Sequence, residues 1–169
     1  MEERTLISRA VTGDKEAFAA LYMQYRDSLY RYAYFRLGND ADAEDAVSAC
    51  IVAAYENIGS LKNEGAFRVW VFRVLYRCCC KIIREQIAAS DREDEAALER
   101  MPSADSAQLS PELQEAFGVL SDEDREIVLL SVIAGYTSRE IAALLNLKSS
   151  TVRSRLMRGL SKMRVFLGE

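Results

Sequence analysis

Apolar residues recur at intervals of three and four along most of this chain, which is the spacing of one face of an α-helix. The pattern predicts helices over about residues 15–37, 41–58, 64–86, 111–120 and 122–134, and two more on either side of Asn146. Proline, which interrupts helices, occurs only twice in the 169 residues. The expected fold class is therefore all-α.

Residues that favour helix ends stand between these segments. Gly38 suits the C-cap of the first helix, and Asp40 can serve as the N-cap of the second. Ser110 followed by Pro111 is typical of a helix start, with serine as N-cap and proline in the first turn. Ser121 is a candidate cap for the next helix. The positions of these capping residues thus agree with the helix ends that the apolar periodicity predicts.

The same spacing predicts which side chains face inward. In the second helix they are Val47, Ile51, Tyr55 and Ile58, and in the third they are Phe67, Val71, Val74, Cys78 and Ile82. Another side of the third helix carries only cations: Arg73, Arg77, Lys81 and Arg84. Such a stripe can be a solvated face, but the lack of any acidic partner favours contact with phosphates. Phe67 and Trp70 are three residues apart, so they suit either the core or the stacking of bases.

Two short helices near the C-terminus have the pattern of a helix-turn-helix. Thr137 and Glu140 form a capping box at the start of the first. Asn146 falls at the turn, where a left-handed backbone is needed and asparagine is tolerated. Ser149 or Ser150 can cap the second helix. This motif predicts that the second helix enters a DNA groove.

The second helix of this motif has two distinct faces. The apolar face comprises Val152, Leu156, Leu160, Met163 and Leu167, and the basic face comprises Thr151, Arg155, Arg158 and Lys162. Arg153 and Ser154 flank the basic face near the helix start, where helix-turn-helix proteins read bases. The alternative is an amphipathic helix whose cations are merely solvated.

Charge is distributed in blocks along the chain, although the net charge is only −4. Residues 60–84 and 131–169 each carry a net charge of +5, whereas residues 85–130 carry −10. Each basic block can hold phosphates, and the acidic block between them discourages indiscriminate DNA binding. The chain is thus expected to comprise a helical domain over 1–86, an acidic linker over 87–109 and a helix-turn-helix domain over 110–169.

The cysteines and the absence of histidine limit the possible chemistry. Cys78, Cys79 and Cys80 are adjacent, so their side chains point in different directions on a helix and cannot share a metal ion. With no histidine, imidazole catalysis is excluded. We expect no metal, no cofactor and no enzymatic activity, with reduced cysteines as core residues. The sequence also lacks an apolar signal segment or membrane span, so a cytoplasmic protein is expected.

Together these features resemble the extracytoplasmic-function sigma factors of bacterial RNA polymerase, over about residues 15–167. The C-terminal resemblance is carried by Leu120-Ser121, Arg125, Gly135-Tyr136, Glu140-Ile141-Ala142 and Thr151-Val152-Arg153-Ser154-Arg155-Leu156. The N-terminal resemblance is carried by Phe18, Leu21-Tyr22, Tyr25, Leu29-Tyr30-Arg31-Tyr32-Ala33, Ala43-Glu44-Asp45, Phe67-Arg68, Trp70 and Arg73.

The resemblance implies three surfaces and their ligands. Core RNA polymerase would bind Asp45, Ser48, Ala49 and Val52. The minus-ten promoter element would be melted and held by Phe67, Arg68, Trp70, Arg73, Arg77, Lys81 and Arg84. The minus-thirty-five element would be read by Ser149, Ser150, Thr151, Arg153, Ser154, Arg155 and Arg158. An anti-sigma factor that clamps the two domains is a further partner that the resemblance implies.

The chain departs from the family pattern on the first two surfaces. The family usually has a Gln-Glu pair where Ser48 and Ala49 stand, and Asn and Asp near Arg77 and Lys81. These changes motivate one alternative, a degenerate regulator that binds polymerase without opening promoters. The other alternative is a stand-alone helix-turn-helix regulator, although no dimerisation segment is evident.

Overall fold

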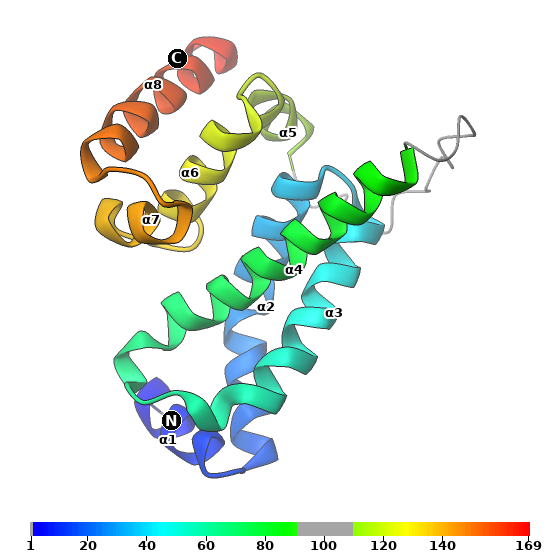
Figure 1. The fold of residues 1–169 in the computed structure, drawn as a ribbon, viewed down its shortest axis with the longest axis vertical. Coiled ribbons are helices and arrows are strands. Elements are labelled where there is room, and N and C mark those ends of the chain that lie inside the picture. Colours follow the sequence, from blue (N-terminus) through cyan, green and yellow to red (C-terminus); the bar gives the residue numbers. More distant parts are fainter. Residues whose placement is uncertain (1, 91–109) are drawn as a thin grey trace.

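The computed structural model describes residues 2–90 and 110–169, and every regular element in these ranges is helical. The N-terminal unit contains α1 (Glu3–Val11), α2 (Lys15–Leu37), α3 (Asp40–Asn57), the 3₁₀ turns η1 (Ile58–Ser60) and η2 (Glu64–Ala66), and α4 (Phe67–Ser90). The C-terminal unit contains α5 (Pro111–Gly118), α6 (Asp122–Val132), α7 (Ser138–Leu145) and α8 (Ser149–Leu167). The all-α expectation is confirmed (Figure 1).

The N-terminal unit is a bundle of α2, α3 and α4, with α1 packed across one end (Figure 1). The periodic pattern did not predict α1, because a nine-residue helix shows little more than one repeat of its apolar side. Leu6, Ile7 and Ala10 on α1 are nevertheless buried. The helix therefore closes the end of the bundle where α2 begins.

The helix ends of this unit follow the capping expectations with one correction. Gly38 ends α2 in the left-handed conformation, at φ 86°, as predicted. The N-cap of α3 is Asn39 rather than Asp40, because the Asn39 side chain accepts a hydrogen bond from the backbone N–H of Asp42. Asp40 lies within the first turn of α3 and is buried.

The buried faces of α3 and α4 differ from the predicted ones in part. Tyr55 was expected to face inward, but it is 44% exposed and its ring meets only the edge of Phe18. On α4 the fully buried residues after Val71 are Phe72, Leu75 and Cys79, whereas Val74, Cys78 and Ile82 are only partly buried. A helix that packs against two others buries a wider arc of its surface than a single stripe of residues. The sequence pattern placed the centre of the buried arc of α4 one position too early.

The C-terminal unit has the capping that its sequence predicts. Ser110 and Ser121 cap α5 and α6, and Thr137 and Glu140 form a capping box on α7. Asn146 has φ 57°, so it makes the left-handed turn of the helix-turn-helix.

Neither Ser149 nor Ser150 caps α8, contrary to expectation. The N-cap position is Lys148, which makes no side-chain capping bond, and both serines already lie in the first helical turn. The hydroxyl groups of these serines are therefore not used to cap the backbone of α8.

The third helix extends further than the predicted end at about residue 86. Residues 87–90 belong to α4, which continues to Ser90, so the predicted domain end at residue 86 falls inside a helix. Residues 91–109 lie outside the described part of the chain. No helix in the described ranges is both long enough and apolar enough to span a bilayer.

Candidate nucleic-acid interface

The four cations predicted to form a stripe on α4 do lie on its exposed side. Arg73, Arg77, Lys81 and Arg84 are all exposed. None of them forms an ion pair with another described residue. Four unneutralised positive charges on one side of one helix make a surface that attracts a polyanion.

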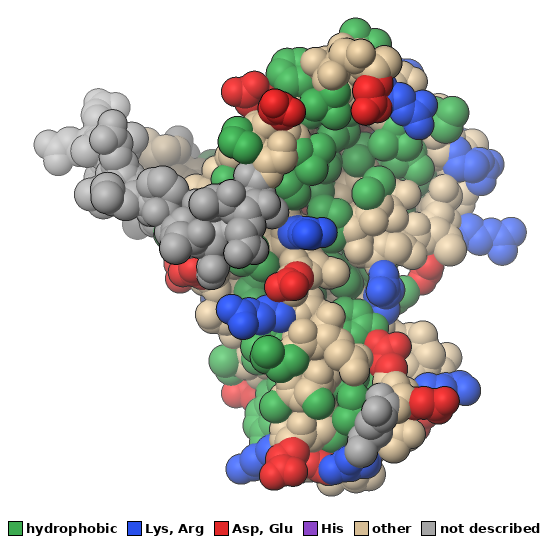
Figure 2. Space-filling model, turned by 180° about the vertical axis from the view of Figure 1, so that it is seen from behind, with side chains coloured by type: hydrophobic (Ala, Val, Ile, Leu, Met, Phe, Trp, Pro, Cys, Tyr) green, Lys and Arg blue, Asp and Glu red, His purple; other side chains and the backbone are tan. Residues whose placement is uncertain are grey.

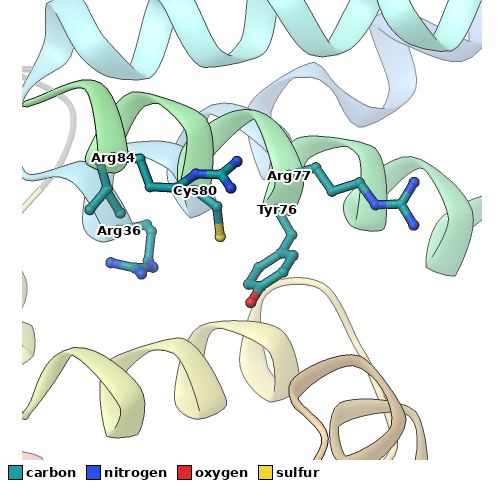
Figure 3. A pocket seen from close by; sticks show the side chains of 6 residues that line it. Arg36, Tyr76, Arg77, Cys80 and Arg84 are labelled. Atoms are coloured by element: carbon teal, nitrogen blue, oxygen red, sulfur yellow. The ribbon is translucent and has the colours of Figure 1, made fainter. Parts of the chain in front are cut away.

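Beside this stripe, an open cavity of about 430 Å³ lies where α2 and α4 meet. It is lined by Arg36 from α2 and by Tyr76, Arg77, Cys80, Ile83 and Arg84 from α4. Figure 3 shows Arg36 and Arg84 near Cys80, while Arg77 extends along α4 away from them. No acidic side chain lines the cavity, so it is a second place suited to phosphate oxygens.

At the start of α4 the structure separates the predicted aromatic pair. Phe67 is only 4% exposed and packs edge-on against Tyr25, with 5.2 Å between ring centroids. Its ring has no free face for a base, so it is a core residue here, and the stacking role predicted for Phe67 is not supported. Trp70 is half-buried beside Phe67, and the exposed Arg68 places its guanidinium 5.7 Å from the centre of the Tyr25 ring.

The recognition helix α8 presents a mixed surface of hydroxyl groups and cations. Ser150, Arg153, Ser154 and Arg158 are exposed, whereas Ser149 and Thr151 are half-buried. The Ser154 hydroxyl donates to the Ser150 carbonyl at 2.8 Å, which leaves the lone pairs of its oxygen turned outward. Arg153 carries a charge that no described residue neutralises, and it stands in the first turns of α8, where base contacts are made.

Arg155 differs from the other predicted base readers. Its guanidinium pairs with Glu123 at 2.7 Å and with Asp124 at 3.0 Å, both in the first turn of α6. The side chain is 26% exposed, and its pKa is raised, first by the Glu123 carboxylate. In this arrangement Arg155 joins α8 to α6, and its guanidinium is not free to pair with guanine.

The residues predicted to meet core polymerase lie on one face of α3. Asp45, Ser48, Ala49 and Val52 are all exposed, and their spacing of three, one and three places them side by side. Val52 is 58% exposed, and the neighbouring Tyr55 extends the apolar part of this face. A surface of one carboxylate, small residues and exposed apolar groups suits a protein partner better than DNA.

The two units meet through a buried polar cluster that sequence reasoning did not predict. Glu126 of α6 is 3% exposed and accepts hydrogen bonds from the Tyr32 hydroxyl and from Nε of Arg36, both on α2. Burial raises the pKa of Glu126 to about 8. A signal was present in the sequence, because Glu126 precedes the apolar Leu129 and Leu130 by three and four positions and so shares their buried side.

Further contacts between the units surround this cluster. The Tyr34 hydroxyl donates to Oε1 of Gln114 at 2.8 Å, and Nε2 of Gln114 donates to the Gly38 carbonyl at 3.1 Å. The rings of Phe35 and Phe117 stack with their centroids 4.8 Å apart. Nearer the start of α4, the Tyr136 hydroxyl donates to the carbonyl of Val69. The two units therefore form a closed arrangement in which α6 lies against α2.

The cysteines are buried or half-buried, and all four are free thiols. Burial raises the pKa of Cys79 to about 12 and also raises that of Cys50, whose thiol donates to the Val71 carbonyl at 3.7 Å. Neither group forms a reactive thiolate at neutral pH. Among the described residues, no cluster of three or more His, Cys, Asp or Glu side chains could bind a metal ion.

Comparison with known families matches both units. Residues 21–87 match the profile of sigma-70 region 2, and residues 110–163 match that of sigma-70 region 4. The chain belongs to the extracytoplasmic-function group of the sigma-70 family. The region 2 match covers most of α2, all of α3 and most of α4, and the region 4 match covers α5 to α7 and most of α8.

Individual sigma factors show how far this similarity extends. SigE of Mycolicibacterium smegmatis is 30% identical over 94% of this chain and 65% of its own length. SigW of Bacillus subtilis is 28% identical over 94% of this chain and 92% of its own. This chain thus spans slightly less than two thirds of SigE but most of SigW.

Solved structures agree with this sigma-factor fold. The structure of CnrH in complex with the cytosolic domain of CnrY is 25% identical, with a TM-score of 0.70 over 98% of this chain and 97% of that one. The sigma factor RpoE of Bartonella quintana, solved with the anti-sigma factor NepR, has a TM-score of 0.72 at 19% identity over 89% of this chain and 96% of that one, and supports the fold alone.

Proposed function

We propose that this protein is a sigma factor that binds core RNA polymerase and directs it to a specific set of promoters. The observation that carries this proposal is the pair of exposed cationic surfaces, one on α4 in region 2 and one on α8 in region 4. The protein has no catalytic chemistry in this role and works by binding energy alone. Its place of action is the cytoplasm, where polymerase and promoters are.

Region 2 would hold the minus-ten element through α4. The exposed Arg73, Arg77, Lys81 and Arg84 supply phosphate contacts along one side of the helix. At its start, Arg68 and the half-buried Trp70 are the groups nearest to where an unpaired base could stack. Phe67 has no part in this proposal, because it is buried.

Region 4 would read the minus-thirty-five element through the first turns of α8. Arg153 is the best candidate for a base contact, since its guanidinium is exposed, forms no ion pair with a described residue and can donate two bonds to guanine. Ser150, Ser154 and Arg158 are exposed beside it and suit base or phosphate contacts, and the half-buried Ser149 and Thr151 would lie nearer the backbone. Arg155 contributes to this surface indirectly, because its ion pairs with Glu123 and Asp124 hold α8 against α6.

Core polymerase would dock on the α3 face of Asp45, Ser48, Ala49 and Val52. The short side chains of Ser48 and Ala49 on this face favour one second candidate function, a degenerate sigma-like regulator with a weakened polymerase contact. A protein that clamps the two regions is a further proposed partner, and the complex of CnrH with the cytosolic domain of CnrY supports it.

In vitro transcription of the source genome tests the proposal. Core polymerase is assayed with the wild-type chain, with Arg153→Gln, with Arg77→Gln, and with the control Arg26→Gln, an exposed cation of α2 that belongs to neither cationic surface. New transcripts with shared upstream elements, reduced by the first two variants and kept by the control, would support the sigma factor.

Other results would point elsewhere. Stable binding to core polymerase without new transcripts would favour the degenerate regulator. Neither transcripts nor binding to core would overturn both candidate functions and favour a stand-alone DNA-binding protein.

A further inference from the structure

One arginine of α2 belongs to two sites at once. Nε of Arg36 donates to a carboxylate oxygen of Glu126 on α6, and the same side chain lines the cavity between α2 and α4 with Arg84 and Arg77. The Arg36 side chain is 14% exposed, so it is mostly removed from water in the closed arrangement. The state of this guanidinium therefore connects the domain interface with the DNA-facing side of region 2.

The contact with Glu126 exists only because the two units are closed. Both hydrogen-bond donors to Glu126, Tyr32 and Arg36, lie on the other unit. When the units separate, the carboxylate loses these partners and returns to water. A buried ion pair contributes little net stability, but leaving one partner buried and unpaired is strongly destabilising. The closed arrangement therefore requires that Arg36 be available to Glu126.

The cavity offers the Arg36 guanidinium a second possible ligand, which would compete with Glu126. Three guanidinium groups line it, no carboxylate does, and Arg77 and Arg84 have no acidic partner among the described residues. Arg36 and Arg84 line this cavity from different helices, and Figure 3 shows Cys80 between their guanidinium groups. A guanidinium group binds a carboxylate or a phosphate with two parallel hydrogen bonds. The Arg36 guanidinium cannot donate both of these bonds to Glu126 and to a phosphate at the same time.

We propose that Arg36 is a switch residue, held by its hydrogen bond to Glu126 when the two units are closed and completing a phosphate pocket with Arg84, next to Arg77 along α4, when they separate. The ligand is a backbone phosphate of promoter DNA, so this inference rests on the proposed function of α4. Because both states need the same guanidinium, DNA binding and closure oppose each other. By linkage, DNA that occupies the pocket favours the open arrangement to the same degree that closure weakens DNA binding.

The location of the pocket agrees with this role. It lies on the same helix as the exposed cations Arg73 and Lys81, so a strand that follows the stripe passes Arg77 and Arg84. Figure 2 shows several separate basic groups on the opposite face of the molecule, which lie among acidic and apolar ones. The α4 side, in contrast, has a continuous run of cations.

Two substitutions that break the same contact should have opposite effects on DNA binding. Glu126→Ala removes the acceptor and releases Arg36 for the pocket, whereas Arg36→Gln removes the pocket charge itself. Both variants should increase the radius of gyration of the full-length chain in small-angle X-ray scattering, because both weaken closure. Glu126→Ala should raise the affinity for a fluorescent duplex severalfold, and Arg36→Gln should lower it and reduce the salt dependence by about one phosphate contact.

Control variants distinguish this coupling from a general loss of stability or of positive charge. Arg26→Gln removes an exposed cation of α2 far from the pair and should change neither radius nor affinity beyond a small general electrostatic effect. Tyr32→Phe removes one donor to Glu126 but keeps the Arg36 side chain, so it should open the chain with Arg36 intact and shift DNA affinity in the direction of Glu126→Ala. Circular dichroism confirms that each variant remains helical.

The outcomes are decisive in both directions. If Arg36→Gln and Glu126→Ala change DNA affinity in the same direction, or if neither alters the radius, the switch is overturned. Duplex DNA that expands the wild-type chain supports it. Tripolyphosphate that expands the chain in the same Arg36-dependent way also supports the pocket, with free polyphosphate as a second source of the ligand. A chain that switches in this way yet yields no transcripts with core polymerase would overturn the proposed function and leave the switch standing.

Discussion

Closure of the two units should depend on pH through a single carboxyl group. Glu126 is buried against α2, and burial raises its pKa to about 8, whereas in an open chain it would return to the ordinary value of 4.5. A group with a higher pKa in the closed state binds a proton on closing. Its contribution to closure is therefore fully present below pH 4.5 and is lost as the pH rises through 8.

The size of the effect follows from these two values. Lowering the pH from 8 to 5.5 would favour the closed arrangement by up to about 3 kcal/mol if only burial acted. The Arg36 guanidinium opposes the shift by stabilising the charged form, so we expect about 1–3 kcal/mol, or a change of about ten- to a hundredfold in the ratio of closed to open molecules.

Few other groups can produce such a change. The chain has no histidine. The groups that face Glu126 are Tyr32 and Arg36 from α2 and, within its own unit, Tyr136, which has Arg73 of α4 beside it. Burial raises the pKa of Tyr136 still further above the range between pH 5.5 and 8. A transition in this window would therefore report on Glu126.

Two measurements test this prediction. Carbon-13 NMR of the Glu126 side-chain carboxyl follows its protonation directly, and small-angle scattering at pH 5.5 and 8 follows the separation of the units. The radius of gyration should fall as the pH is lowered, and Glu126→Gln should abolish this dependence. A wild-type carboxyl that titrates near 4.5 in a closed chain would refute the reasoning, as would an unchanged pH response in Glu126→Gln.

Four further predictions concern region 4. Arg155→Ala should lower the stability of this unit by about 1 kcal/mol in thermal or urea unfolding, because it frees two carboxylates of α6. Arg153→Ala should leave stability unchanged and weaken promoter selection by about 1–3 kcal/mol in competition binding. If instead Arg155→Ala weakened promoter selection and Arg153→Ala lowered stability, Arg155 would be the base reader and Arg153 the structural residue. Thr137→Ala removes the capping box and should cost about 1 kcal/mol in urea unfolding, whereas Thr137→Ser should not; equal losses would exclude capping as the cause. Gly159→Ala should cost about 1–3 kcal/mol by crowding, because its added carbon would lie 3.2 Å from a side-chain carbon of α6. Gly118→Ala, with open space at that position, is the matched control, and equal effects would contradict the packing argument.

Local signals in the sequence predicted most of the helices and several of their ends. Thr137 with Glu140, Asn146 and Gly38 each specify their cap or turn through their own side chain or backbone freedom. Where two neighbours could perform the same task, the prediction failed, as with Asp40 in place of Asn39. The short helix α1 was missed because its stability comes from packing on α2 and the 3₁₀ turns rather than from its own pattern.

The candidate site was predictable in outline, since a basic stripe and a helix-turn-helix are both periodic features. The sequence did not show which members of each set are accessible. Phe67 and Trp70 have the same spacing in either role, and only packing against Tyr25 places Phe67 in the core. Arg155 belongs to the basic face by spacing, yet carboxylates more than thirty positions away in α6 neutralise it.

By itself, the sequence determined the all-α class, the order of the main helices, the helix-turn-helix and the two basic blocks, because each depends on residues within one or two helical turns of each other. The tertiary structure alone decided that Glu126, Tyr32 and Arg36 form one buried cluster, and that Arg36 also borders the α4 cavity. Those residues lie about ninety positions apart in the chain, and no periodicity reaches that far. Their contact exists only because apolar faces of α2 and α6 bury it from water.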